Sequence, residues 1–302
     1  MIKIRLVSNY TTSENLTEVL FKTFVTPQMR DTYSSIEFVF GDKYDWLFVF
    51  NRYGAKIFCP KRRVIAILQE PFWSPVYINN RLNMYCGRVY SPHNPRYRIQ
   101  QIPALMYNFT GLTPEQSLDN ISFRKPHKCS FVVSNLNGGG DERLYAYRHK
   151  LVEQILNSNL DIHIFGRGWS IEDERYKGEL PEKKNALLDY EYSICIENSR
   201  IDDYVTEKFW DPILCNTLPI YYGAENIANI APVNCFIDLE NMDLQSLEAQ
   251  LKLPLDEAQK QAILSAKEEY YSKRNIFLFI ADLVSMPAHP WWSRFLKPGL
   301  WP

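Results

Sequence analysis

The sequence predicts an α/β protein built from two Rossmann-like domains that face each other across a cleft. Short runs rich in Ile, Val, Phe and Trp alternate with helical patterns along the chain, which is typical of mostly parallel sheets. These runs are almost continuously apolar rather than alternating, as in strands that are covered on both faces. The length of 302 residues fits about two domains.

The first domain is expected to cover residues 1–125. A helix is expected at residues 15–23, where the apolar side chains fall on one side. Strands are expected at residues 2–7, 35–40, 46–50 and 64–68. The pattern weakens beyond residue 91, where prolines interrupt the chain, and we place the domain junction near residues 120–127.

The second domain is expected to cover residues 126–302. Strands are expected at residues 130–134, 160–165, 192–196 and 218–222, and helices at about 142–157 and 204–216. In open α/β sheets, ligands bind at the carboxyl ends of the strands. The cleft between the two domains is therefore the predicted ligand site.

Charge and composition exclude several classes of protein. Lys and Arg number 34 and Asp and Glu 35, so the net charge of −1 gives no overall field that favours nucleic acid. The six cysteines form no CxxC pair and are expected to be buried free thiols. The N-terminus lacks the pattern of a signal peptide, and no window is apolar enough to span a membrane. We therefore expect a cytoplasmic location.

The most informative segment reads YSICIENSRIDDYVTEKFWDPILCNTLPIYYG. A strand brings Glu197 and Asn198 to its carboxyl end, and a helix then begins near Tyr204. A helix N-terminus with Lys208 nearby suits a diphosphate, and the Glu207 carboxylate can accept hydrogen bonds from ribose hydroxyls. A capped surface helix with an ordinary Glu–Lys pair fits the same residues.

This segment resembles the signature of the α-1,3/4-fucosyltransferases, family 10 of the glycosyltransferases. The matching runs are Glu197-Asn198-Ser199, Tyr204-Val205-Thr206-Glu207-Lys208 and Pro219-Ile220-Tyr221-Tyr222-Gly223. The resemblance covers roughly residues 129–223. It implies a GT-B fold, GDP-fucose as the donor and inversion at the anomeric carbon. Pro212 departs from the family pattern and predicts a kink or a later start of the helix.

Two further segments resemble parts of the family's donor site. In CSFVVSNLNGGGDERLYAYR, the resemblance implies an arginine that contacts the diphosphate; Arg143 is the first choice and Arg148 the second. A solvated helix arginine is the alternative. IFGRG resembles a family turn that places Gly166 and Arg167 at the donor, although a plain tight turn fits as well. The predicted donor-binding residues are Arg143, Gly166, Arg167, Glu197, Asn198, Tyr204, Glu207 and Lys208.

Glu70 follows the strand at residues 64–68, in the run Gln69-Glu70-Pro71. A similar segment in the family carries the general base, and the resemblance implies that role for Glu70. Inversion needs a base that deprotonates the acceptor hydroxyl as it attacks opposite the leaving GDP. An ordinary loop role is the alternative, and Asp45 is the next acid to consider.

No Asp-x-Asp and no metal-binding histidine spacing occurs in the chain. We therefore expect that no cofactor is required, that a divalent metal is at most stimulatory, and that Lys208, Arg143 and the helix terminus neutralise the diphosphate. The expected partners are a GDP-sugar and an oligosaccharide, glycolipid or glycoprotein acceptor, with no nucleic acid. The aromatic and basic tail at residues 288–302 suits either peripheral membrane contact or docking on the domains.

The sequence thus predicts an inverting fucosyltransferase of glycan biosynthesis. Two alternatives stay open: a transferase of the same fold that uses another GDP-sugar, and a catalytically silent sugar-nucleotide or glycan-binding module. The intact Glu-Asn-Ser and Tyr-Val-Thr-Glu-Lys runs favour an enzyme.

Overall fold

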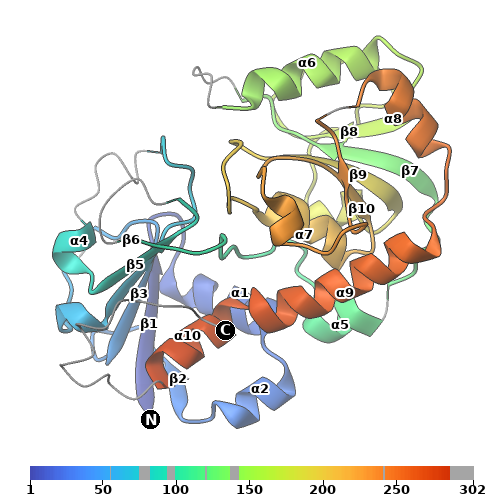
Figure 1. Cartoon of the computed structure of the whole chain (residues 1–302). Coiled ribbons are helices and arrows are strands. Elements are labelled where there is room, and N and C mark those ends of the chain that lie inside the picture. The colour runs from blue at the N-terminus through green and yellow to red at the C-terminus, as the bar shows by residue number, and fades with distance from the viewer. Residues whose placement is uncertain are drawn as a thin grey trace.

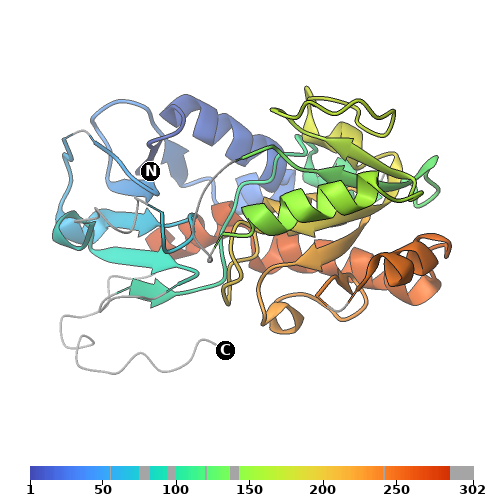
Figure 2. The same cartoon turned by 90° about the horizontal axis from the view of Figure 1, so that it is seen from above.

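The described residues form two parallel β-sheets with helices between their strands (Figures 1 and 2). The computed structural model describes residues 1–54, 56–74, 82–93, 99–119, 121–136, 143–240 and 242–285. The strand orders are β2-β1-β3-β4-β5-β6 and β11-β10-β9-β7-β8. The prediction of two Rossmann-like α/β domains is confirmed.

The first sheet contains the four predicted strands and two that the sequence pattern did not indicate. Its strands are β1 (Ile2–Ser8), β2 (Ile36–Phe38), β3 (Trp46–Phe50), β4 (Val64–Ile67), β5 (Arg88–Ser91) and β6 (Ile99–Gln101). β6 is short and largely exposed, so it lacks the apolar run that marks a covered strand. The accompanying helices are α1 (Ser13–Phe24), α2 (Pro27–Thr32), the 3-10 turn η1 (Lys61–Arg63) and α4 (Leu82–Tyr85).

The second sheet contains all the strands predicted for that domain. Its strands are β7 (His127–Val132), β8 (Ile162–Phe165), β9 (Tyr190–Ile196), β10 (Leu218–Tyr222) and β11 (Ile237–Asp238). Around them lie α5 (Pro114–Asp119), α6 (Tyr145–Leu156), η2 (Lys183–Ala186), α7 (Glu207–Leu214), η3 (Ile227–Asn229) and α8 (Leu244–Leu251). Pro212 lies inside α7, in its buried face, so it does not mark the start of this helix.

The last two helices return the chain to the first sheet. α9 (Glu257–Lys273) packs against α5 and α7, and α10 (Ile276–Ser285) packs against α1 (Figure 1). Asn275 joins them, and its side-chain amide donates to the backbone oxygen of Phe24 at 2.9 Å. Phe277 of α10 packs on Phe21 and Phe38. The last described helix of the predicted second domain, residues 126–302, therefore packs on the first sheet.

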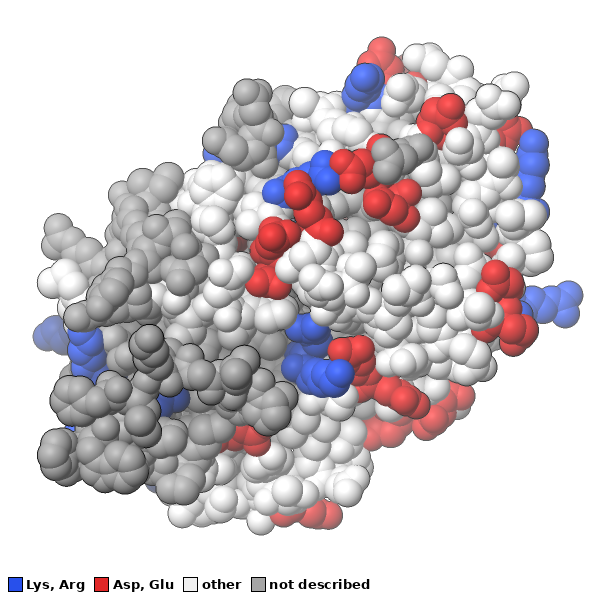
Figure 3. Space-filling view, viewed as in Figure 1, with Lys and Arg blue, Asp and Glu red and all other residues white. Residues whose placement is uncertain are grey.

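The six cysteines are free and five of them are buried, as their scattered positions predicted. None of the helices in the described part of the chain is both long and apolar enough for a membrane span. On the face shown in Figure 3, acidic and basic side chains lie close to one another rather than in separate patches. The aromatic tail predicted to touch a membrane or the domains lies outside the described residues.

Candidate active site

A cavity of about 390 Å³ lies where the carboxyl ends of the strands of the two sheets approach each other. Residues that follow β1, β3 and β4 form one side, and residues that follow β9 form the other. The segment that links the two sheets closes the cavity with three side chains. The residues that line the cavity include Tyr10, Asn51, Gln69, Glu70, Met106, Tyr107, Phe109, Asn198, Tyr204, Glu207 and Lys208.

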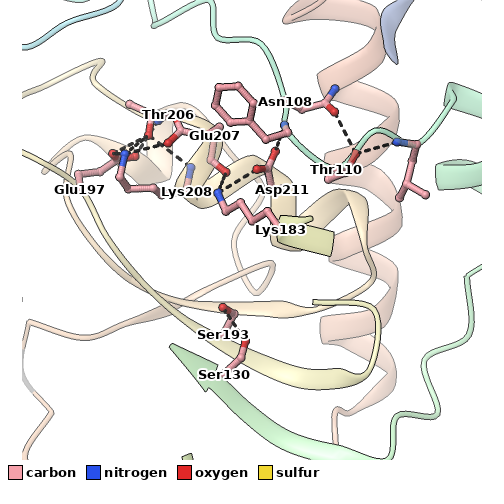
Figure 4. Close-up of polar contacts among 12 residues, drawn as sticks. Asn108, Thr110, Ser130, Lys183, Ser193, Glu197, Thr206, Glu207, Lys208 and Asp211 are labelled. Carbon is pink, nitrogen blue, oxygen red and sulfur yellow. Dashed lines mark hydrogen bonds and ion pairs between the residues drawn. The ribbon is translucent and has the colours of Figure 1, made fainter. Parts of the chain in front are cut away.

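Glu197 holds the turn between β9 and α7 together (Figure 4). One carboxylate oxygen accepts from the backbone N–H of Thr206 and the other from its hydroxyl, both at 2.7 Å. The side chain is completely buried, and burial raises its pKa although Lys208 opposes this. Glu197 is absent from the cavity lining, and its two oxygens fix the start of α7; a contact between Glu197 and the donor stays a prediction.

Glu207 and Lys208 are the charged pair at the start of α7 that lines the cavity. Their side chains are 14% and 23% exposed, and Lys208 Nζ lies 2.9 Å from Glu207 Oε1. Burial disfavours a charged Glu207, but Lys208 and Lys183 outweigh it and lower the pKa of Glu207 to about 2. Glu207 is therefore an ionised acceptor at neutral pH, and Lys208 supplies a positive charge beside it.

A buried ion pair supports this helix start from below (Figure 4). Lys183 Nζ lies 2.8 Å from Asp211 Oδ2 and donates to the backbone oxygen of Glu207 at 3.1 Å. Asp211 also accepts from the backbone N–H of Phe109 at 3.1 Å. Since Phe109 lines the cavity, Asp211 ties the linker between the sheets to α7.

Arg148 positions the end of β9 rather than facing the cavity. Its guanidinium is buried and donates to the backbone oxygen of Ile196 at 2.5 Å and to Asn198 Oδ1 at 2.9 Å. Asn198 lines the cavity together with Tyr204. Both hydrogen bonds come from Nη2, so this one nitrogen holds Arg148, the second choice for the diphosphate arginine, against the end of β9.

Arg143 stacks on Trp73, an aromatic side chain that follows β4 in the other domain. Its guanidinium is 4.2 Å from the centre of the Trp73 ring, and the Trp73 indole N–H donates to the Ser199 hydroxyl. Arg143 is half-buried and is absent from the residues that line the described cavity. The glycine run that precedes it lies outside the described residues.

Gly166 and Arg167 also stand apart from the cavity lining. Gly166 has φ +144°, and a Cβ there would come within 1.9 Å of the backbone oxygen of Val133. Glycine is thus required by the close approach of two protein segments. Arg167 is exposed, and its backbone oxygen accepts from Asn135 at 2.9 Å.

Glu70 faces Glu207 and Lys208 across the same cavity. Burial raises its pKa; the positive charge of Lys208 lowers it, and the negative charge of Glu207 raises it further. Asp45, the other acid considered, lies at the start of β3 and is 3.6 Å from Arg63. That is the opposite end of the strand from the cavity, so the structure gives Asp45 no access to it.

Sequence reasoning missed the polar residues that support Glu70. Asn51 Oδ1 accepts from the backbone N–H of Gln69 at 2.7 Å, and Tyr10 donates to Gln69 Oε1 at 3.0 Å. Their positions just beyond β1, β3 and β4 were the available signal, since carboxyl ends of parallel strands meet at one edge. Among the described residues, no group of three His, Cys, Asp or Glu side chains is placed to hold a metal ion.

The fold is shared with a solved structure titled "Crystal Structure of alpha1,3-Fucosyltransferase". The two superpose with a TM-score of 0.51 and 19% sequence identity over 89% of this chain and 80% of that chain. Two parallel α/β sheets whose carboxyl ends face each other across a cavity are the architecture of the GT-B fold.

The chain belongs to glycosyltransferase family 10 (fucosyltransferase): residues 123–274 match the family's C-terminal region. It is 43% identical over 54 residues to alpha-(1,3)-fucosyltransferase B of Drosophila melanogaster, which is 18% of this chain and 12% of that protein. It is 44% identical over 48 residues to GDP-fucose protein O-fucosyltransferase 3 of Rattus norvegicus, 16% of this chain and 10% of that protein. The chain thus matches only a small part of each relative, and Glu70 lies outside the family match.

Proposed function

We propose that the protein transfers fucose from GDP-fucose to a hydroxyl group of a glycan acceptor, with inversion at the anomeric carbon. The observation that carries the proposal is the placement of Glu70 in one cavity with Glu207 and Lys208. The family and the names of the relatives support fucose as the transferred sugar. A protein that adds fucose to a glycan would act in glycan biosynthesis, which is the role that we propose.

On the donor side, the start of α7 supplies the positive charge. A lysine at a helix N-terminus adds a positive charge that stabilises a diphosphate. Lys208 is in that position, and Glu207 presents an ionised carboxylate that can accept two hydrogen bonds from ribose hydroxyls. Asn198 and Tyr204 add polar groups on the same side. Charge that develops on the leaving GDP would thus be stabilised.

On the acceptor side, Glu70 is the base. Its carboxylate takes the proton of the acceptor hydroxyl, the freed oxygen bonds to the anomeric carbon of fucose, and the bond from that carbon to the β-phosphate oxygen breaks. GDP carries away the electron pair. A pKa raised by burial makes a carboxylate a better proton acceptor, which favours this role.

The remaining features of the proposal follow from the same site. The Lys208 charge and the helix terminus supply the neutralisation that a metal ion gives other transferases, so we propose that no cofactor is required and that a divalent ion is at most stimulatory. The acceptor is proposed to be an oligosaccharide, or the glycan of a glycolipid or glycoprotein. An N-acetylglucosamine- or glucose-type unit is the expected sugar.

A donor screen tests the proposal. Purified protein is incubated with GDP-fucose, GDP-mannose or UDP-N-acetylglucosamine and a panel of glycan acceptors, and the anomeric configuration of the product is read by NMR. We expect turnover with GDP-fucose alone and a product of inverted configuration. Turnover only with another GDP-sugar would favour the second transferase hypothesis. Binding of GDP-fucose without turnover on any acceptor would favour a silent binding module.

A further inference from the structure

Trp73 connects the turn that carries Glu70 to the opposite domain. Glu70 directly precedes the turn of residues 71–74, which contains Trp73 and is closed by a backbone hydrogen bond of 2.9 Å from Ser74 N–H to the Pro71 oxygen. The Trp73 indole N–H donates to Ser199, 126 residues away in the chain. Ser199 is completely buried and directly follows Asn198, which lines the cavity. The indole thus links the base's turn to the Glu-Asn-Ser segment.

The ring of Trp73 also contacts two side chains of the second domain, to which Ser199 belongs. The Arg143 guanidinium lies over the ring face at 4.2 Å from its centre, and the Tyr145 ring meets it edge-on at 6.5 Å. Stacking engages the face of a guanidinium and leaves its N–H edge available for hydrogen bonds. Arg143 can therefore hold Trp73 and a phosphate oxygen at the same time.

We propose that Trp73 is a positioning residue: through Ser199 and Arg143 it fixes the Glu70 turn against the donor-binding domain. The inference rests on the proposed role of Glu70 as the base. The indole N–H of the half-buried Trp73 has its acceptor in Ser199, and Ser199 supplies it only while the two domains are in contact. The base is thus held in place by the segment that follows β9, next to the donor cavity. A displacement of about 1 Å of a catalytic group costs up to about 100-fold in rate.

The test separates the hydrogen bond from the ring. Trp73→Phe keeps an aromatic face for Arg143 but removes the N–H, and Ser199→Ala removes the acceptor. Each should lower kcat about 10-fold or more while GDP affinity, measured by calorimetry, changes less than about twofold. Trp46→Phe is the matched control, because Trp46 begins β3 at the end away from the cavity, and its kcat should be unchanged.

A double-mutant cycle with Glu70→Gln distinguishes positioning from a general loss of structure. If Trp73 acts through Glu70, adding Trp73→Phe to Glu70→Gln should change kcat less than about twofold. Effects that multiply, or an unchanged kcat in Trp73→Phe, would overturn the inference. An unchanged kcat in Glu70→Gln itself would instead remove the proposed base. Thermal unfolding of each variant shows whether it folds. If Trp73→Phe does not fold, Ser199→Ala takes its place in the cycle with Glu70→Gln.

Discussion

Glu70 has a carboxyl group on which two neighbours act in opposite directions: Lys208 lowers its pKa and Glu207 raises it, while burial raises it most. An acid in these surroundings keeps a proton more readily than an exposed glutamate. This balance is set by side chains from the other domain, at the start of α7. The rate of the proposed reaction should therefore depend on Glu70 in two measurable ways.

The first concerns removal of the base. Glu70→Gln keeps the shape of the side chain but cannot accept a proton, so kcat should fall by at least about 100-fold, within the usual contribution of a general base. The affinity for the GDP-sugar should stay within about threefold, less than ~0.7 kcal/mol. Steady-state kinetics and calorimetry measure the two. Near-normal turnover in a folded variant would exclude Glu70 from the chemistry.

The second concerns pH. Glu70 must be ionised to act, so kcat at saturating donor should fall as the pH drops below its raised pKa. Lys208→Met removes the charge that lowers this pKa and should move the acid limb to higher pH. Glu207→Gln removes a charge that raises it and should move the limb to lower pH. Shifts in the same direction would contradict the assignment.

The donor contacts allow a test by binding alone. Lys208→Ala and Arg143→Ala should each weaken GDP binding by more than about 1.5 kcal/mol, the lower range for hydrogen bonds to charged groups. Calorimetry measures this without any turnover. Lys252→Ala is a control, because Lys252 is 71% exposed and pairs with Glu248 at the end of α8. Unchanged affinity in both test variants would place the diphosphate elsewhere.

At the scale of elements, the junction of β9 and α7 shows what sequence can and cannot resolve. The motif predicted a helix start near Tyr204, and the structure places the first helical residue at Glu207, with Thr206 as the N-cap. The motif did not distinguish Glu197 from Glu207. Both acids flank the same turn, and only the packing reveals that Glu197 faces Thr206 while Glu207 faces the cavity.

α9 carries a buried amine that should make stability depend on pH. Burial lowers the pKa of Lys267 to about 7, and its Nζ donates to the backbone oxygen of Ser117 at 2.5 Å. In the unfolded chain the pKa of this amine is ~10.4. Between these values the unfolded state binds more protons, so the stability of the folded state rises as the pH rises above 7.

Lys267→Met measures this contribution by difference. As the pH rises from about 7 to about 9, the wild-type protein should gain stability over the variant, by at most ~1.4 kcal/mol per pH unit. Urea unfolding of both proteins at several pH values gives the comparison. A difference that stays constant over this range would show that the amine titrates at its ordinary pH inside the protein.

At the scale of the whole molecule, the two parallel sheets were predictable because covered strands need long apolar runs, such as those of β3, β4 and β9. The return of α10 to the first sheet could not be predicted from the sequence. α10 is apolar enough to be buried on either domain, and its position depends on Phe21 and Phe38, more than 200 residues away. Sequence periodicity gives no information about such distant partners.

The charge balance of the site predicts how the whole enzyme responds to chelators. Lys208 lies in the cavity, where it can neutralise the diphosphate. Turnover should therefore survive excess EDTA, although an added divalent ion can accelerate product release. The assay compares initial rates with EDTA, with Mg²⁺ and with Mn²⁺. A complete loss of activity in EDTA that the metal restores would show that the diphosphate needs an ion.

Within the part of the chain that the structure describes, the return of α10 gives the two domains two covalent connections: the linker that carries Ala104 and Phe109, and the turn at Asn275 between α9 and α10. A single connection would permit rotation about any axis through it. Two separate connections leave one easy axis, the line that passes through both. Any rotation of one domain against the other is therefore confined to an arc about this line, which is the geometry that keeps Trp73 opposite Ser199.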